Sequence, residues 1–271
     1  MTERLSLVLP AYNEEANLPA VVSEALSVLP TYFNDFEVIV VNDGSRDRTA
    51  EVARELGAQD ARVKLVDLRQ NQGYGGALRS GFAASTGDLV MFMDADRQFA
   101  ISDISRLVPF IHSHDIVAGF RMERSDRLHR RVFAETFNVS IRILFGVHMR
   151  DIDCAFKIFD GAMLRSINLT SSGALINTEI MAKARRQGAR VQQVGVQHFP
   201  RTAGASTGGN PEVILKAMQR HTAPLVAYAH TIRYHPDRPA PVSRHRLPKA
   251  NRGHGGRRGC DAGRPAHSQE N

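Results

Sequence analysis

Residues 91 to 96, Met91-Phe92-Met93-Asp94-Ala95-Asp96, join an apolar run to two carboxylates that stand one residue apart. The apolar run is typical of a buried strand. Carboxylates at the carboxyl end of such a strand lie where open α/β sheets bind their ligands. Paired oxygen ligands at that edge commonly hold Mg²⁺ or Mn²⁺ against a phosphate. Taken alone, the motif also fits a solvated turn, so other segments have to decide between the two.

Strand-like and helix-like segments alternate over the first 120 residues. Buried apolar strands that alternate with helices form mostly parallel sheets covered on both faces. The pattern therefore predicts an α/β fold with a doubly wound, mostly parallel sheet. The expected strands are 5–10, 37–42, 63–68, 89–93 and 116–119, and the expected helices are 15–29, 49–56, 75–85 and 102–113.

The second half of the chain alternates less regularly. Strands are expected at 154–159 and 190–196, and helices at 127–145, 177–187 and 211–233. The last of these helices should bend or split at Pro224, because proline cannot continue the helical hydrogen bonding.

The formal charge of +7 is concentrated at the end of the chain. Residues 237–271 hold seven Arg and one Lys against three acidic residues, a net charge of +5. This segment is rich in Pro, Gly, Arg and His without apolar periodicity, so 235–271 is predicted to be a disordered basic tail. It could contact anionic lipid or simply be solvated. No aromatic stacking platform accompanies its arginines, so nucleic acid is not an expected partner.

The cysteines and the amino terminus bear on the compartment. Cys154 and Cys260 share no metal-ligand spacing, which suits a reducing environment and argues against a zinc site or disulfide scaffold. The start of the chain lacks the apolar region of a signal peptide, and no run approaches the ~18 apolar residues of a membrane span. We therefore expect a cytoplasmic location.

Three polar clusters follow predicted strands, at residues 9–14, 41–45 and 94–98. Because the carboxyl ends of parallel strands meet at one edge of a sheet, we expect these clusters to lie together. The ring of Tyr12 can pack on a base, and the carboxylates of Glu14 and Asp43 can accept hydrogen bonds from a base or a ribose. Asp96, supported by Asp94 and Gln98, can hold a divalent cation that bridges diphosphate oxygens.

The second polar cluster and a glycine-rich segment at 71–76 also have plain structural explanations. Asn42-Asp43-Gly44 is a good turn sequence by itself. The glycine-rich segment 71–76 could be an ordinary loop, or its glycines could let a phosphate approach the start of a helix.

Three segments in this order and spacing resemble family 2 glycosyltransferases of the GT-A fold: Leu9-Pro10-Ala11-Tyr12-Asn13-Glu14, Asn42-Asp43-Gly44-Ser45 and Asp94-Ala95-Asp96-Arg97-Gln98. Later segments, at 118–121, 129–131, 151–157 and 198–204, are similar to the polyprenyl-phosphate sugar synthases, the branch that includes dolichol-phosphate mannose synthase. The resemblance covers roughly residues 5–218. It implies a Rossmann-like GT-A domain in which 1–120 bind the nucleotide sugar and 121–234 bind the acceptor.

The resemblance also implies roles for single residues. The nucleotide sugar would be bound by Pro10, Tyr12, Glu14, Asp43, Asp94 and Ala95. Mg²⁺ or Mn²⁺ would be held by Asp94, Asp96 and Gln98. The acceptor phosphate and the diphosphate would be bound by Arg121, Arg130, Arg131 and Arg201, with Asp96, Arg121 and Arg130 central to catalysis. The chain departs from the branch at Ala134, where Ser is usual, and at Thr207, where Lys is usual, so acceptor recognition could differ in detail.

The expected reaction follows from the acceptor. A lipid monophosphate is already an anion and can attack the sugar without a general base, with inversion at the anomeric carbon. A hydroxyl acceptor on a cell-surface glycan would need a base, for which Asp151 and Asp153 are the candidates. A third possibility is a non-catalytic module that binds nucleotide sugars.

The implied donor is a nucleotide sugar of the GDP-mannose or UDP-glucose type, and the implied acceptor is dolichyl or undecaprenyl phosphate. Processive polysaccharide synthases of the family carry a Gln-x-x-Arg-Trp element, and this chain has no Trp. Apolar stripes at 132–141 and 213–218 could lie in a membrane interface or in the core. We therefore expect peripheral contact with the inner face of a membrane or with a membrane protein.

Overall fold

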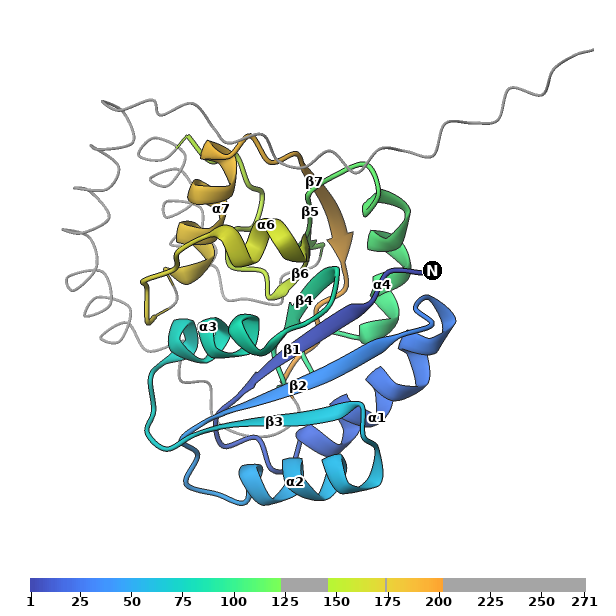
Figure 1. The fold of residues 1–271 in the computed structure, drawn as a ribbon, viewed down its shortest axis with the longest axis vertical. Coiled ribbons are helices and arrows are strands. Elements are labelled where there is room, and N and C mark those ends of the chain that lie inside the picture. Colours follow the sequence, from blue (N-terminus) through green and yellow to red (C-terminus); the bar gives the residue numbers. More distant parts are fainter. Residues whose placement is uncertain (123–145, 174, 202–271) are drawn as a thin grey trace, which may run out of the picture.

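The computed structural model of the chain describes residues 1–122, 146–173 and 175–201 (Figure 1). The helices expected at 127–145 and 211–233 and the basic tail at 235–271 lie outside the described residues. None of the described helices is long and apolar enough to cross a bilayer.

One sheet of seven strands, in the order β3-β2-β1-β4-β6-β5-β7, forms the centre of the described structure. Only β6 is antiparallel to its neighbours, so the expected α/β fold with a mostly parallel sheet is confirmed. The two predicted halves of the chain both contribute strands to this sheet. The strands are β1 (Leu5–Ala11), β2 (Phe36–Asp43), β3 (Val63–Leu68), β4 (Leu89–Met93), β5 (Ile116–Arg121), β6 (Phe156–Asp160) and β7 (Val191–Val196).

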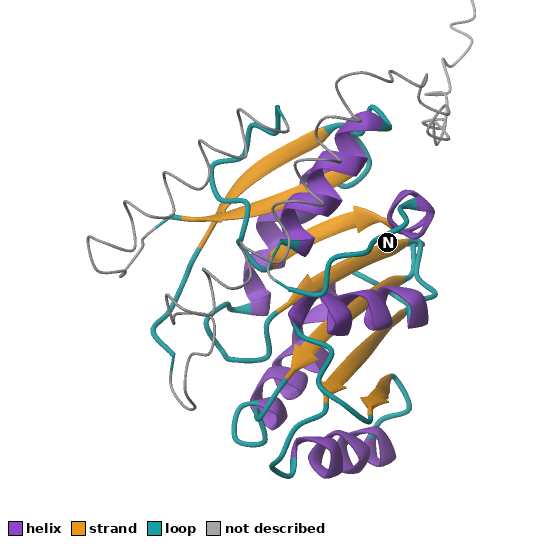
Figure 2. Ribbon diagram, turned by 90° about the vertical axis from the view of Figure 1, so that its left-hand side faces the viewer, coloured by secondary structure: helices purple, strands orange, loops and turns teal. Residues whose placement is uncertain are grey.

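Helices cover both faces of the sheet (Figures 1 and 2). Helices α1 and α2 pack on one face, and α3 and α6 pack on the other beside α7. The sheet is therefore doubly wound, as the alternation of strands and helices predicted. The bounds are α1 Leu18–Val28, α2 Thr49–Gln59, α3 Tyr74–Ala84, α4 Ile104–Leu107, α6 Gly161–Ser166 and α7 Ile176–Arg186.

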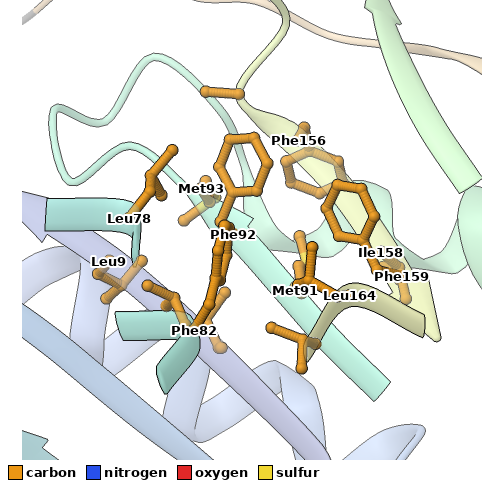
Figure 3. Close-up of a cluster of buried hydrophobic side chains, with 14 of the residues drawn as sticks. Leu9, Leu78, Phe82, Met91, Phe92, Met93, Phe156, Ile158, Phe159 and Leu164 are labelled. Atoms are coloured by element: carbon orange, nitrogen blue, oxygen red, sulfur yellow. The ribbon is translucent and has the colours of Figure 1, made fainter. Parts of the chain in front are cut away.

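Part of the hydrophobic core lies where β4 meets β6 (Figure 3). Phe92 of β4 stacks on Phe159 of β6, with ring centroids 6.0 Å apart. Phe82 of α3 packs edge-on against both rings. Helix α3 approaches the sheet so closely at Gly81 that a Cβ atom there would lie 2.3 Å from Val8 Cγ1. This packing ties the antiparallel strand to the strand that ends in the two carboxylates.

Two expectations for the elements need correction. The single helix expected at 102–113 is wrong: the structure has a 3₁₀ turn at Ile101–Asp103, the short helix α4, and a second 3₁₀ turn at Val108–Phe110. Pro109 accounts for the break, since it has no N–H to donate to the preceding turn. The strand expected at 154–159 exists as β6, but its insertion between β4 and β5 was not expected.

Two buried carboxylates, Glu37 and Glu179, make stability depend on acid. Burial alone would raise the pKa of Glu37, but hydrogen bonds from Lys64, Ser6 and Thr86 outweigh it and lower the pKa to about 2. Glu179 behaves alike: bonds from Lys183, Ser171 and Thr170 outweigh burial and lower its pKa to about 2.

Both carboxylates therefore stabilise the fold above their ordinary pKa of 4.5, and lose that effect as the pH falls toward 2. We expect the free energy of unfolding to fall between pH 5 and pH 2 by on the order of 2–3 kcal/mol for each group. Denaturant unfolding across this range measures it. A Glu37→Gln variant should be less stable at pH 7 and show a shallower pH dependence; an unchanged slope would contradict the assignment.

Candidate functional site

The carboxyl ends of β1, β2 and β4 lie side by side at one edge of the sheet. Strand β1 is in parallel register with β2 up to the pair Ala11–Asn42, and with β4 up to the pair Val8–Phe92. The polar residues that follow these strands therefore meet, as the sequence predicted. We call this group of loops the carboxyl rim, comprising residues 10–17, 42–49 and 94–98.

The loops after β1 and β2 are bonded to each other. Asn13 has a left-handed backbone with φ of 56°, and its side-chain oxygen accepts from the Arg46 N–H at 2.8 Å. The Glu14 N–H donates to Thr49 Oγ1 at 2.9 Å. These bonds hold the Glu14 carboxylate in a buried position, where Asn17 Nδ2 donates to it at 2.7 Å. Burial raises the pKa of Glu14.

Asp43 lies at the end of β2, with only 4% of its surface exposed. The Gln72 N–H donates to its Oδ1 at 2.6 Å, while burial raises its pKa. The neighbouring Asn42 donates from Nδ2 to Asp67 Oδ1 at 2.7 Å. Pro10 is buried at the end of β1, and Tyr12 is half-buried in the loop that follows. The four residues expected to hold a nucleoside are thus on one edge.

The glycine-rich segment before α3 packs against protein backbone. The Gly75 N–H donates to the Ser172 carbonyl at 2.9 Å, and the Gly76 N–H points to the same oxygen at 3.4 Å. A Cβ atom on Gly75 would lie 2.5 Å from the Ser171 carbonyl oxygen. The glycines therefore permit close approach of residues 171–173 to the start of α3, and the approach of a phosphate does not explain them.

Asp94 and Asp96 share a tight turn in which Arg97 has a φ of 63°. Asp94 Oδ1 is buried and has no hydrogen-bond partner among the described residues. Burial, and then the negative charge of Asp96, raise the pKa of Asp94 to about 7, while a hydrogen bond from the Tyr74 hydroxyl opposes the shift. Asp96 is buried and its Oδ1 accepts from the Gln98 N–H at 3.1 Å. The charge of Asp96 disfavours the ionised form of Asp94, and a cation bound at the two carboxylates would offset this effect.

The two carboxylates fit a divalent cation whose remaining ligands come from a bound substrate. In the described part of the chain, no group of three or more His, Cys, Asp or Glu side chains gathers to hold a metal ion alone. Mg²⁺ is usually bound through one or two carboxylates together with substrate phosphates, and Asp94 and Asp96 provide the two carboxylates. Gln98, the third expected ligand, donates from Nε2 to the Phe199 carbonyl at 3.3 Å. Its role toward a metal remains a prediction.

Arg201 brings positive charge to the carboxyl rim. Its guanidinium forms an ion pair with Glu14 Oε1 through Nη2, and Nη1 lies 3.5 Å from Asp96 Oδ2. The side chain is 20% exposed. The Phe199 N–H donates to the Gln98 carbonyl at 2.9 Å and fastens the segment that carries Arg201. This arginine is distant in sequence from the carboxylates, and the structure places it among them as expected.

Arg121, at the end of β5, is held by a buried carboxylate. Its Nε donates to Asp151 Oδ2 at 2.6 Å and its Nη2 to Oδ1 at 2.9 Å, a bidentate ion pair. Both oxygens of Asp151 are thus engaged. Arg130 and Arg131, the other two expected phosphate ligands, lie outside the described residues.

Two residues of the site were not predicted. Tyr74 bonds Asp94, although only its glycine-rich neighbours drew attention. Lys157 is buried within β6, where its Nζ donates to the carbonyl of Ile152 at 3.0 Å and to that of Cys154. A single lysine in the apolar run Phe156-Lys157-Ile158-Phe159 was a signal that could have identified it.

Comparison with known proteins identifies the family. Residues 6–169 match the family described as glycosyl transferase family 2, which is more than half of the chain. The chain therefore belongs to glycosyl transferase family 2. This confirms the resemblance carried by the three polar strand ends.

Curated relatives come from the lipid-phosphate branch. The chain is 36% identical over 158 residues to an undecaprenyl-phosphate 4-deoxy-4-formamido-L-arabinose transferase of Aeromonas hydrophila, covering 57% of this chain and 48% of the relative. It is 32% identical over 212 residues to a dolichyl-phosphate beta-glucosyltransferase of Trichomonas vaginalis, covering 71% and 65%. The chain thus spans about half to two thirds of the length of these relatives.

Solved structures support the fold. Glucosyl-3-phosphoglycerate synthase of Mycobacterium tuberculosis, in complex with Mn²⁺, UDP and glucosyl-3-phosphoglycerate, superposes with a TM-score of 0.63 at 23% identity. The match covers 85% of this chain and 80% of the synthase. At this identity the likeness concerns the fold alone, and the expected GT-A architecture is confirmed by it.

Proposed function

We propose that this chain transfers a hexose from a nucleotide sugar to a polyprenyl phosphate, with inversion at the anomeric carbon. The observation that carries the proposal is a carboxyl rim whose buried carboxylates, suited to a nucleotide sugar and its metal, contact Arg201. Arg121 lies at the carboxyl end of β5, which runs in the same direction as β4. Two curated relatives are named for transfer to undecaprenyl and dolichyl phosphate, which supports this class of acceptor.

In the proposed donor complex, Glu14 and Asp43 accept hydrogen bonds from the nucleoside, and Tyr12 and Pro10 pack against it. Ala95 is buried between the two aspartates and lets the diphosphate approach the turn. Asp94 and Asp96, with Gln98, would hold Mg²⁺ or Mn²⁺. When bound, that ion neutralises charge on the departing diphosphate. The structures of the synthase with Mn²⁺ and UDP support a divalent metal at such a site.

In the proposed transfer step, an oxygen of the acceptor phosphate forms a bond to the anomeric carbon. The bond from that carbon to the diphosphate breaks, and the nucleoside diphosphate leaves with the electron pair. Arg121, Arg130, Arg131 and Arg201 would orient the two phosphate groups, a task that suits the planar guanidinium. No general base is required, since the attacking oxygen is already anionic.

A hydroxyl acceptor is less well supported. It needs a carboxylate that can take a proton, for which Asp151 and Asp153 are the candidates. Both oxygens of Asp151 accept hydrogen bonds from Arg121, which leaves Asp153, exposed in the same turn, as the candidate base. The curated relatives named for transfer to lipid phosphates favour the other acceptor. We therefore retain the phosphate acceptor as the proposal.

We further propose that the chain works at the cytoplasmic face of a membrane, held there peripherally or by a membrane protein. The described residues include two large, exposed apolar side chains, Met122 at 47% and Phe199 at 41%. Each lies within two residues of a proposed phosphate arginine, Arg121 or Arg201. Such a pairing suits an acceptor whose phosphate joins an isoprenoid chain. In this proposal, residues 1–120 bind the donor and residues 121–234 bind the acceptor.

The test is a transfer assay with membranes, Mn²⁺ and a panel of radiolabelled nucleotide sugars, followed by organic extraction. We expect label in a lipid fraction that mild acid releases as free sugar, because glycosyl phosphate esters are labile to acid. Label found only in water-soluble glycan would contradict the proposal and favour a hydroxyl acceptor. Nucleotide-sugar binding without any transfer would favour a non-catalytic module.

A further inference from the structure

Lys157 is the most deeply buried cationic side chain in the described part of the chain, with 1% of its surface exposed. It pairs with Phe92 of β4 on one side and with Ala118 of β5 on the other. Its Nζ lies 5.3 Å from the centroid of the Phe92 ring. Burying an amine costs desolvation free energy that an apolar side chain of similar size does not. The packing of the sheet alone therefore does not require a lysine here.

The amine of Lys157 fastens the turn that precedes β6. It donates to the carbonyl oxygens of Ile152, at 3.0 Å, and of Cys154. The same turn is closed by the Cys154 N–H, which lies 3.4 Å from the Asp151 carbonyl. Because the lysine sits in the sheet and both carbonyls sit in the turn, the bonds fix residues 151–154 relative to β4 and β5.

The turn at residues 151–154 also holds an arginine in place. Asp151, its first residue, is 3% exposed and accepts from Arg121 Nε and Nη2, and from the Arg121 N–H at 3.3 Å. A carboxylate that bonds both the backbone and the guanidinium of one residue leaves the side chain little freedom. The contacts therefore run without a gap from Lys157 through the turn to Arg121.

We propose that Lys157 is a positioning residue, which holds the turn 151–154 so that Asp151 fixes the Arg121 guanidinium at the edge of the carboxyl rim. That this guanidinium meets an acceptor phosphate rests on the proposed function; the chain of contacts does not. Burial lowers the pKa of Lys157, and the carboxylates of Asp151 and Asp153 oppose that shift.

The first arm of the test does not depend on catalysis. In nuclear magnetic resonance, an arginine Nε–H held in a bidentate ion pair gives its own resonance, which an Arg121→Lys variant assigns by its loss. We expect Lys157→Met to remain folded, with an unchanged or higher melting temperature, and to shift or broaden this resonance. A folded Lys157→Met protein with the Arg121 resonance unchanged would overturn the inference.

The second arm separates binding from turnover. With a polyprenyl phosphate acceptor, we expect Lys157→Met to lower kcat/KM for the acceptor by about 10- to 100-fold, as a misplaced binding group does. The affinity for UDP with Mn²⁺ should stay within twofold. In an Asp151→Asn background, Lys157→Met should lower kcat/KM for the acceptor by less than threefold, since both changes release the same arginine. Additive losses, or an equal loss of donor affinity, would overturn the positioning role.

Lys64→Met is the matched control. Lys64 also pairs with a buried group, Glu37, but at the far edge of the sheet, so its loss should lower stability without changing the Arg121 resonance or the acceptor kinetics. Should Lys157→Met fail to fold, Lys157→Gln keeps a donor without the charge and is measured by the same resonance. A wild-type protein that transfers nothing to a lipid phosphate would refute the proposed function, while the resonance arm still decides the role of Lys157.

Discussion

Replacing Asp96 with asparagine is expected to lower the rate of sugar transfer by about 100- to 1000-fold and to leave the fold intact. The amide keeps the size of the side chain but removes one of the two anionic oxygen groups that face a cation. The charge of Asp96 raises the pKa of Asp94 and is unfavourable to it, while its contact with Arg201 at 3.5 Å is favourable, so the two losses should largely offset each other in stability. Initial rates at several Mn²⁺ concentrations measure transfer, thermal unfolding measures stability, and calorimetric titration compares Mn²⁺ binding with that of the control.

Asp88→Asn provides the control for Asp96. Asp88 precedes the same strand at its opposite end, is exposed, and accepts from the Arg4 N–H at 3.0 Å. It should leave both Mn²⁺ affinity and transfer unchanged. Full transfer by the Asp96→Asn protein at ordinary Mn²⁺ concentrations would remove Asp96 from the proposed metal site.

Replacing Arg201 with methionine is expected to change cation binding and transfer in opposite directions. The guanidinium pairs with Glu14 and Asp96, so it competes with a divalent ion for the same carboxylate. Removing one such ion pair, worth about 1 kcal/mol, should tighten Mn²⁺ binding to the nucleotide-free protein by about fivefold. Transfer should fall by about 100-fold, because a group that stabilises phosphate charge is lost.

Two controls sharpen the Arg201 experiment. Arg201→Lys keeps the positive charge without the bidentate geometry, so Mn²⁺ affinity should stay near that of the wild type while transfer still falls. Arg106→Met removes a different ion pair, in which Arg106 Nε lies 3.0 Å from Asp103 Oδ1. It should change neither Mn²⁺ affinity nor transfer. Weaker Mn²⁺ binding by Arg201→Met would show that the arginine supports the cation site rather than competing with it.

Much of the fold could be predicted because the central strands β1, β2 and β4 are buried along their whole length. Runs such as Glu37–Asn42 and Leu89–Met93 are apolar almost without interruption. In parallel sheets such a run indicates both the strand and the position of its end. The insertion of β6 could not be predicted, because an apolar run carries no information on strand direction or on neighbours distant in sequence. The break of the helix at Pro109 could have been predicted from the missing N–H.

The residues of the site also divide into those that could be predicted from the sequence and those that could not. Glu14, Asp43, Asp94 and Asp96 follow strand ends, so the position of the strands determines theirs. The pairing of Arg121 with Asp151 and of Arg201 with Glu14 joins residues 30 and 187 positions apart, and local pattern does not encode such contacts. The glycines before α3 were ambiguous for the same reason, since their partner, the backbone at 171–173, is about a hundred residues away.

The antiparallel insertion of β6 has a consequence for biosynthesis. Among the described strands, β5 bonds only to β6 and β7, both of which follow it in the chain, and β6 lies between β4 and β5. During translation β1 to β4 can assemble in order of synthesis, but β5 has to wait for residues 156–160 before it finds a neighbour. A nascent chain halted before that point carries the paired strands β1 to β4 next to an unpaired strand β5, and an unpaired strand edge is prone to aggregation.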